Sequence, residues 1–209
     1  MEGLIKIMAE LVFYYGAMSC SKTANALMTR FQYLDKGLGV WLIKPSTDNR
    51  DDIIYEDGHV TNIIKSRVGI FAEADVIYPV ESFYEKLKVR CCEGKRTDLI
   101  IVDEAQFLSE EQVDELKDIT ETMDISVYCY GLRTDFRTKL FPGSKRLFEI
   151  GKVVELESVC SCGKPAIINA RFDKTGRLMT HGAQVDIGGD EKYKALCYSC
   201  WKELTKKYV

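Results

Sequence analysis

The segment from Gly16 to Thr23 contains the residues whose types and spacing most clearly predict chemistry. An apolar and aromatic run, Leu11–Tyr15, stops at Gly16, and Lys22-Thr23 closes the loop before a helix-like stretch. This is the outline of the phosphate-binding loop G-x-x-x-x-G-K-[ST], in which backbone N–H groups and a helix N-terminus surround phosphate oxygens. Lys22 is expected to reach the β- and γ-phosphates, and the Thr23 hydroxyl to bind Mg²⁺. The alternative is an ordinary strand–turn–helix with a surface lysine.

Ser21 departs from this motif, because it stands where the second glycine is expected. Glycine tolerates left-handed or crowded backbone, whereas a serine there costs about 1–3 kcal/mol. The serine leaves open an alternative in which the protein binds nucleotide but is weakly active or not catalytic.

A second candidate element for phosphate chemistry is an acidic pair that follows a continuous apolar run. Leu99–Val102 is typical of a strand buried on both faces, and Asp103-Glu104 follows it directly. Ligands bind outside the carboxyl ends of such strands, so Asp103 is expected to hold Mg²⁺ through water. Glu104 points the other way and is expected to be free to take a proton from an attacking hydroxyl. The alternative is a pair of capping acids before the helix that starts near Ser109.

Basic side chains that could neutralise a developing phosphoryl charge also occur near these elements. They are Arg50, Arg67, Arg133 and Arg137. For each of them, a solvated surface charge is the alternative.

Four of the eight cysteines form two close pairs, Cys160/Cys162 and Cys197/Cys200. Cysteine pairs on short turns are typical of a structural Zn²⁺ site, which takes four thiolates in a tetrahedron. The Cys-x-Cys pair is one residue tighter than usual, and Gly163 can supply the backbone freedom that it needs. The alternatives are free buried thiols or a disulfide.

The elements that must position these residues alternate between strand-like and helix-like segments up to Ile150. This alternation predicts an α/β fold with a parallel sheet and helices on both faces. A polar stretch, Ser46 to Gly58, is predicted to be a mobile loop. Composition changes after Ile150, so we expect a nucleotide-binding domain over residues 1–151 and a smaller zinc-binding domain over 152–209. The predicted strands are Leu11–Tyr15, Gly39–Lys44, Asp75–Val80, Asp98–Val102 and Ile125–Tyr130, and the predicted helices are Lys22–Lys36, Glu81–Val89 and Glu110–Met123.

Composition limits the classes of protein that fit. A chain of 209 residues with 46% hydrophobic content can bury a proper core. The net charge of −3 predicts no general attraction to nucleic acid or to anionic membranes. No apolar run approaches the ~20 residues that span a bilayer, and the N-terminus lacks the pattern of a signal peptide. We therefore expect a cytoplasmic protein without a nucleic-acid or membrane partner.

Taken together, these motifs resemble those of the type II thymidine kinase family along nearly the whole chain, and the Cys-x-Cys-Gly spacing resembles one bacterial branch. The resemblance implies a P-loop (RecA-like) parallel sheet and a small C-terminal zinc-binding subdomain that carries a lasso loop. The motifs that carry it are Phe13–Thr23, Asp103–Phe107, Cys129–Arg137, Leu140–Ser144 and Gln184–Cys197.

The activity that this resemblance implies is transfer of the γ-phosphate of ATP, with Mg²⁺, to the 5′-hydroxyl of thymidine, giving thymidine monophosphate and ADP for DNA synthesis. It implies Glu104 as the catalytic base, a homotetramer, and feedback by thymidine triphosphate. The residues that it places around ATP are Gly16, Ala17, Met18, Ser19, Cys20, Ser21, Lys22, Thr23, Asp48, Arg50, Asp103, Glu104, Ala105 and Gln106. Those that it places around the nucleoside are Met18, Phe107, Leu132, Phe136, Gln184, Val185, Asp186, Ile187, Gly188 and Tyr193.

A nucleic-acid-dependent ATPase is a further alternative, because Asp103-Glu-Ala-Gln106 also resembles a helicase Walker B motif. The sequence argues against it, since no second motor domain is present to supply an arginine finger and the net charge is acidic.

Overall fold

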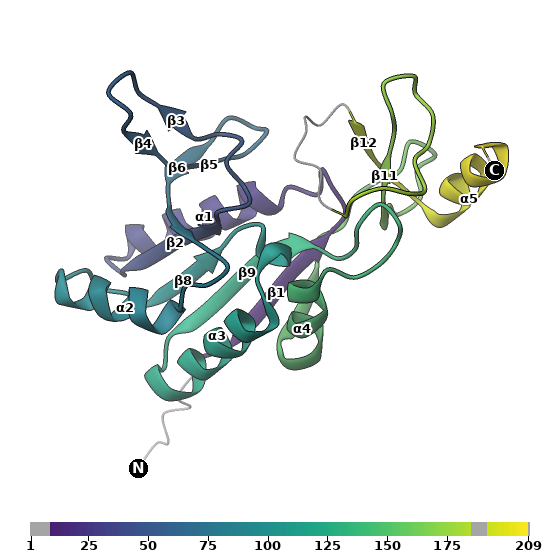
Figure 1. Ribbon diagram of the computed structural model, residues 1–209. Coiled ribbons are helices and arrows are strands. Elements are labelled where there is room, and N and C mark those ends of the chain that lie inside the picture. Colours follow the sequence, from purple (N-terminus) through teal and green to yellow (C-terminus); the bar gives the residue numbers. More distant parts are fainter. Residues whose placement is uncertain (1–8, 185–191, 209) are drawn as a thin grey trace, which may run out of the picture.

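The computed structural model describes residues 9–184 and 192–208, and a six-stranded parallel sheet forms its centre (Figure 1). The strand order is β10-β1-β9-β8-β2-β7, and every neighbouring pair is parallel. This confirms the predicted sheet. The strands are β1 (Leu11–Gly16), β2 (Val40–Pro45), β7 (Asp75–Ile77), β8 (Leu99–Val102), β9 (Ser126–Leu132) and β10 (Lys152–Glu155).

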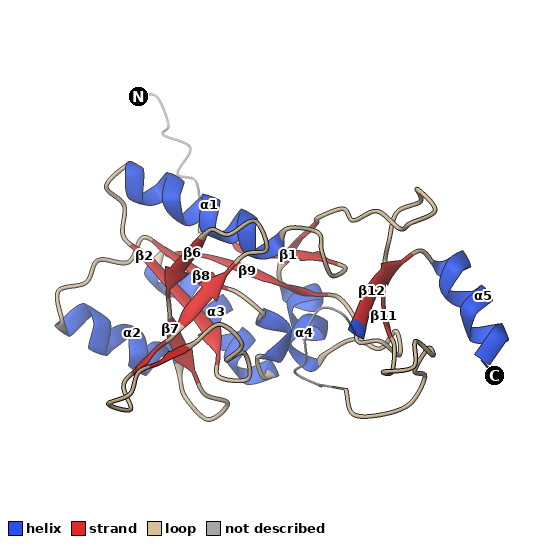
Figure 2. Cartoon of the chain, turned by 90° about the horizontal axis from the view of Figure 1, so that it is seen from above, coloured by secondary structure: helices blue, strands red, loops and turns tan. Residues whose placement is uncertain are grey.

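Helices cover both faces of this sheet, with α1 on one side and α2, α3 and α4 on the other (Figure 2). Side chains alternate between the two faces along each strand, as the period of two requires. On β2, Trp41 and Ile43 pack toward α2 and α3, whereas Val40 and Leu42 pack toward α1. Both faces are therefore apolar, which explains why these strands have continuous apolar sequences. The helices are α1 (Lys22–Asp35), α2 (Phe83–Cys92), α3 (Glu110–Met123) and α4 (Pro142–Ile150).

Helix ends follow local signals in the sequence. Helix α3 begins after a capping box in which Ser109 Oγ accepts from Gln112 N, and it has the bounds that the sequence predicts. Helix α4 was not among the predicted helices. It is nine residues long and has Pro142 in its first turn, where the missing N–H costs nothing.

Between β2 and β7 the chain forms an arm of two antiparallel hairpins, β3–β4 and β5–β6. The arm is anchored on β2 by Lys44, whose side chain is fully buried. Lys44 Nζ donates to Asp52 Oδ1 at 2.7 Å and to Ile63 O at 2.8 Å. The stretch Ser46–Gly58, predicted as a loop, thus contains β3. The arm strands are β3 (Ile53–Ile54), β4 (Val60–Thr61), β5 (Ile63–Lys65) and β6 (Phe71–Glu73).

The C-terminal part lies beside the sheet and has a small core of its own (Figure 1). An antiparallel pair, β11 (Ile168–Arg171) and β12 (Tyr193–Leu196), leads into α5 (Tyr198–Tyr208). Strand β10, which the sequence assigned to the second domain, pairs with β1 in the main sheet. We therefore propose that the division between the two parts falls after Glu155.

No helix in the described ranges is long and apolar enough to cross a membrane.

The buried Lys44–Asp52 pair gives a prediction about stability. Asp52→Ala should lower the free energy of unfolding by about 3 kcal/mol or more, because it leaves a buried ammonium without its charge partner. The double variant Lys44→Met/Asp52→Ala should regain most of that loss. Urea unfolding checks both.

Asp35→Ala is the matched control, because Asp35 pairs with Lys36 on an exposed surface and should change stability by less than about 0.5 kcal/mol. Equal effects at Asp35 and Asp52 would contradict the anchoring role.

Candidate active site

Close packing determines the conformation of the loop after β1, which the sequence predicts to bind phosphate, at its first residue. A Cβ on Gly16 would lie 2.4 Å from Leu156 O and 2.5 Å from Cys20 Sγ, so only glycine fits. Ser19 and Ser21 have φ of 65° and 62°, in the left-handed region. Ser21 therefore adopts a conformation that favours glycine, and α1 begins at the next residue.

Lys22 and Thr23, the last residues of the loop, lie at the start of α1. Lys22 Nζ lies over the loop and donates to Ala17 O at 2.8 Å. The Thr23 hydroxyl lies near the carboxylate of Asp103, so the loop and the end of β8 lie side by side. Burial, followed by the charge of Glu104, raises the pKa of Asp103 to about 7, although the Thr23 hydroxyl acts to lower it.

Glu104, predicted to be able to take a proton, has two hydrogen-bond partners. Arg50 Nη2 donates to Glu104 Oε1 at 2.7 Å, and Gln106 Nε2 donates to Glu104 Oε2. Arg50 Nε also donates to Asp48 Oδ1 at 2.6 Å. Burial acts to lower the pKa of Arg50, but the charges of Glu104 and Asp48 outweigh it and raise that pKa. The prediction missed this pairing because Arg50 lies on a loop far from β8 in the sequence.

Lys22, Arg50 and Glu104 are among the residues that line one cavity of about 610 Å³ at the carboxyl edge of the sheet. It joins the phosphate loop to an apolar wall, and the tip of the β5–β6 hairpin forms a third side. At that tip, Arg67 Nη1 donates to Ser19 Oγ at 2.5 Å. The predicted residues that line the cavity are Met18, Ser19, Ser21, Lys22, Thr23, Asp48, Arg50, Glu104, Gln106, Phe107, Leu132, Phe136, Gln184 and Tyr193.

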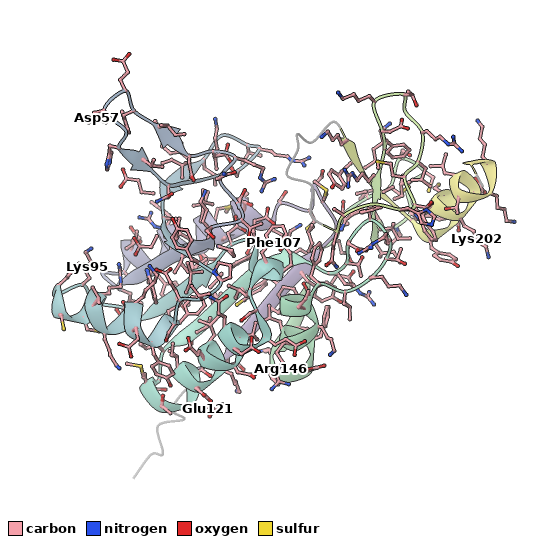
Figure 3. The ribbon with its side chains drawn as sticks, in the orientation of Figure 1. Asp57, Lys95, Phe107, Glu121, Arg146 and Lys202 are labelled. Carbon is pink, nitrogen blue, oxygen red and sulfur yellow. The ribbon has the colours of Figure 1, made fainter. Side chains whose placement is uncertain are left out.

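Phe107, Leu132, Phe136 and Tyr193 form the apolar wall (Phe107 is labelled in Figure 3). Phe107 ends a short 3₁₀ helix, η1 (Ala105–Phe107), that follows Glu104. Leu132 is fixed through its backbone, because its N–H donates to Gln106 Oε1 at 3.0 Å and its carbonyl accepts from Ser144 Oγ at 2.6 Å. Gln106 thus connects Glu104 to the apolar wall.

Several predicted residues lie outside the cavity lining. Gly16, Ala17, Cys20, Asp103 and Ala105 are buried behind it. Val185, Asp186, Ile187 and Gly188 lie outside the described residues.

Two of the candidate arginines also lie elsewhere. Arg137 pairs with Asp135 at 2.9 Å, and Arg133 lies over the ring of Phe148.

Sequence reasoning missed Thr134 and Asn169, which also line the cavity. Asn169 is a buried polar residue in strand β11, between the buried Ile168 and Ala170. A polar residue between two apolar ones in a predicted strand is a signal that could have found it, because buried amides need partners.

The four cysteines predicted to bind metal come together. The sulfur atoms of Cys160, Cys162, Cys197 and Cys200 all lie within 4.8 Å of one another. Gly163 has φ of 83° and its N–H donates to Cys160 O, which closes the tight Cys-x-Cys turn as expected. Four thiolates at this separation suit a tetrahedral metal ion, so the cluster can hold a structural metal.

Comparison with known proteins agrees with this geometry. The model of the thymidine kinase family matches residues 9–201. The thymidine kinase of Enterobacteria phage T4 is 42% identical over 201 residues, which cover 96% of this chain and 99% of the relative. The thymidine kinase of Zymomonas mobilis is 40% identical over 191 residues, covering 91% of this chain and 94% of the relative. That of Ruegeria pomeroyi is 39% identical over 199 residues, covering 95% and 96%. The chain belongs to the thymidine kinase family.

Proposed function

We propose that the protein is a thymidine kinase, which transfers the γ-phosphate of ATP to the 5′-hydroxyl of thymidine and releases thymidine monophosphate and ADP. The observation that carries this proposal is a cavity in which the phosphate loop, the carboxylate of Glu104 and an apolar wall meet. Phosphoryl transfer needs this combination, because catalysis consists mainly of positioning two substrates and stabilising charge.

The phosphate side of the cavity is proposed to bind Mg·ATP. The loop amides and Lys22 would hold the triphosphate, and the Arg50 and Arg67 guanidiniums are near enough to share its charge. Thr23 and Asp103 are the residues proposed to hold Mg²⁺. When bound, this ion would neutralise part of the phosphate charge. The nearness of the Thr23 hydroxyl to Asp103 and the raised pKa of Asp103 support this, since a buried carboxylate among like charges favours a cation.

Glu104 is proposed to act as the general base. It would take the proton from the thymidine 5′-hydroxyl as the oxygen attacks the γ-phosphorus and the bond to ADP breaks. The contacts with Arg50 and Gln106 fix the orientation of this carboxylate in the cavity.

The apolar wall is proposed to enclose the thymidine base. An uncharged base gains most from stacking on aromatic side chains and from fixed backbone hydrogen bonds. Phe107, Phe136 and Tyr193 supply rings at this side of the cavity. The segment that follows Gln184 is proposed to supply the backbone groups that read the base.

The cysteine cluster is proposed to hold Zn²⁺ with a structural role. Nitrogen and sulfur donors suit zinc, and four cysteines leave no open coordination position for chemistry.

We also propose a cytoplasmic homotetramer that thymidine triphosphate inhibits. The exposed Met28 and Phe31 on α1 support an assembly of subunits, because large exposed apolar side chains on one helix often mark an interface.

The role of Glu104 is tested by Glu104→Gln, which keeps the shape of the side chain but removes the base. We expect the kcat for thymidine phosphorylation to fall by about 10²–10⁴, with ATP affinity changed far less. A coupled assay of ADP formation and calorimetry with an ATP analogue measure the two quantities.

The control for this variant is Glu110→Gln on the exposed start of α3, which should keep full activity. Near-normal turnover by Glu104→Gln would exclude the assigned base.

The conformation of Ser21 gives a second prediction. Ser21→Gly should bind Mg·ATP at least as tightly as the wild type, because glycine adopts φ of 62° without strain. Ser21→Val should weaken Mg·ATP binding by more than about tenfold, since a β-branched residue resists this conformation. If calorimetry showed equal affinity for both variants, the left-handed loop would not be what binds ATP.

The proposed zinc site predicts the effect of losing one ligand. Cys200→Ser should lose most of the bound zinc and lower the melting temperature, because metal affinity contributes directly to folding. Elemental analysis and thermal unfolding measure this. Cys91→Ser, which changes an exposed cysteine outside the cluster, is the matched control and should retain the metal. Unchanged zinc content in Cys200→Ser would contradict the assignment.

A further inference from the structure

Asn169 makes two hydrogen bonds that connect the two sides of the cavity. Its Oδ1 accepts from Met18 N of the phosphate loop at 2.7 Å, and its Nδ2 donates to Thr134 O at 2.9 Å. Asn169 as a whole residue is 2% exposed, so water competes little for these bonds. One carboxamide therefore spans two segments that lie far apart in the sequence.

Each of these two segments forms one substrate side of the cavity. Met18 lies within the phosphate loop. Thr134 begins a tight turn that carries Phe136, and Asp135 stiffens this turn by accepting from Arg137 N and Lys139 N. The separation of the loop and the turn determines how far the γ-phosphate lies from the nucleoside hydroxyl, to which transfer rates are very sensitive.

Met18 receives a second contact from the same subdomain, because Ser158 Oγ donates to Met18 O at 3.3 Å. Both backbone groups of Met18 are thus engaged by the C-terminal part of the chain. Asn169 is itself fixed in β11, where it pairs with Ala195 of β12. The phosphate loop is therefore positioned by the C-terminal subdomain as well as by β1 and α1.

We propose that Asn169 is a positioning residue that sets the distance between the phosphate loop and the nucleoside wall. Asn169 acts through Met18 and Thr134, because its side-chain oxygen and one of its side-chain N–H groups form hydrogen bonds with the backbone of these residues. The catalytic part of this role rests on the proposed function. The effect of Asn169 on the phosphate loop can be measured by nucleotide binding alone.

The first variant to test is Asn169→Ala, which removes both hydrogen bonds. We expect the Kd for a non-hydrolysable ATP analogue with Mg²⁺ to rise by about tenfold or more, because Met18 N is left buried without its acceptor. The KM for thymidine should also rise and kcat should fall. Zinc content and melting temperature are measured alongside. A lower melting temperature with unchanged Kd and KM in the folded fraction would overturn the proposal, because it would show a purely structural role.

Asn169→Asp separates the two hydrogen bonds. A protonated Asp can still donate to Thr134 O and accept from Met18 N, whereas the carboxylate loses the donor and repels Thr134 O. Burial raises the pKa of such an acid. The ratio of variant to wild-type kcat/KM for thymidine should therefore approach one at low pH and fall as pH rises. A ratio that did not vary with pH would overturn the role of the Thr134 contact.

Thr175→Ala is the matched control, because Thr175 makes a side-chain hydrogen bond on an exposed turn of the same subdomain. It should change neither Kd nor KM, and a change as large as that of Asn169→Ala would overturn the proposal. A wild type that bound the ATP analogue but phosphorylated no nucleoside would refute the proposed function. The analogue affinities would still decide the role of Asn169.

Discussion

Strand β1 leaves the main sheet at Gly16, and both parts of the molecule depend on the close approach of the chain to itself at this point. A side chain on Gly16 would collide with Leu156 O and with Cys20 Sγ, so the turn is available only to glycine. Leu156 N donates to Tyr15 O at 2.7 Å, which fastens the chain that leads into the C-terminal subdomain to the same turn. The phosphate loop and the chain that leads into that subdomain therefore meet directly at Gly16.

The charges at the strand ends are balanced only in part. Asp48, Asp103 and Glu104 lie close together, and Arg50 pairs with two of them. Asp103 is left with a hydroxyl as its side-chain partner in a buried setting, and its pKa is accordingly raised. Such an arrangement is unfavourable by itself, because desolvated carboxylates repel one another. A bound cation would offset this repulsion, which agrees with the metal–nucleotide site proposed above.

The sequence predicted the sheet and the residues at its carboxyl edge, because both follow from local rules. Leu99–Val102 is apolar without interruption and Asp103 follows it, so the sequence predicted a buried strand that ends at an acidic residue. The arm was not predicted, since its strands are two or three residues long and lie within a polar stretch. The pairing of Glu104 with Arg50 and the contact of Asn169 with Met18 join residues 54 and 151 positions apart. No local pattern encodes such contacts, and only the fold brings them together.

The two serines of the phosphate loop give the contacts at Met18 a further meaning. Ser19 and Ser21 both adopt left-handed backbone, which costs L-residues about 1–2 kcal/mol each relative to glycine. A loop with this strain keeps its shape only if its surroundings determine it strongly. Ser21 O accepts from Asn25 N in the first turn of α1, Ser19 Oγ is held by Arg67, and both backbone groups of Met18 are held by Asn169 and Ser158. We infer that these contacts offset the missing glycine, so that a serine at position 21 is tolerated because the arm and the C-terminal subdomain hold the loop from outside.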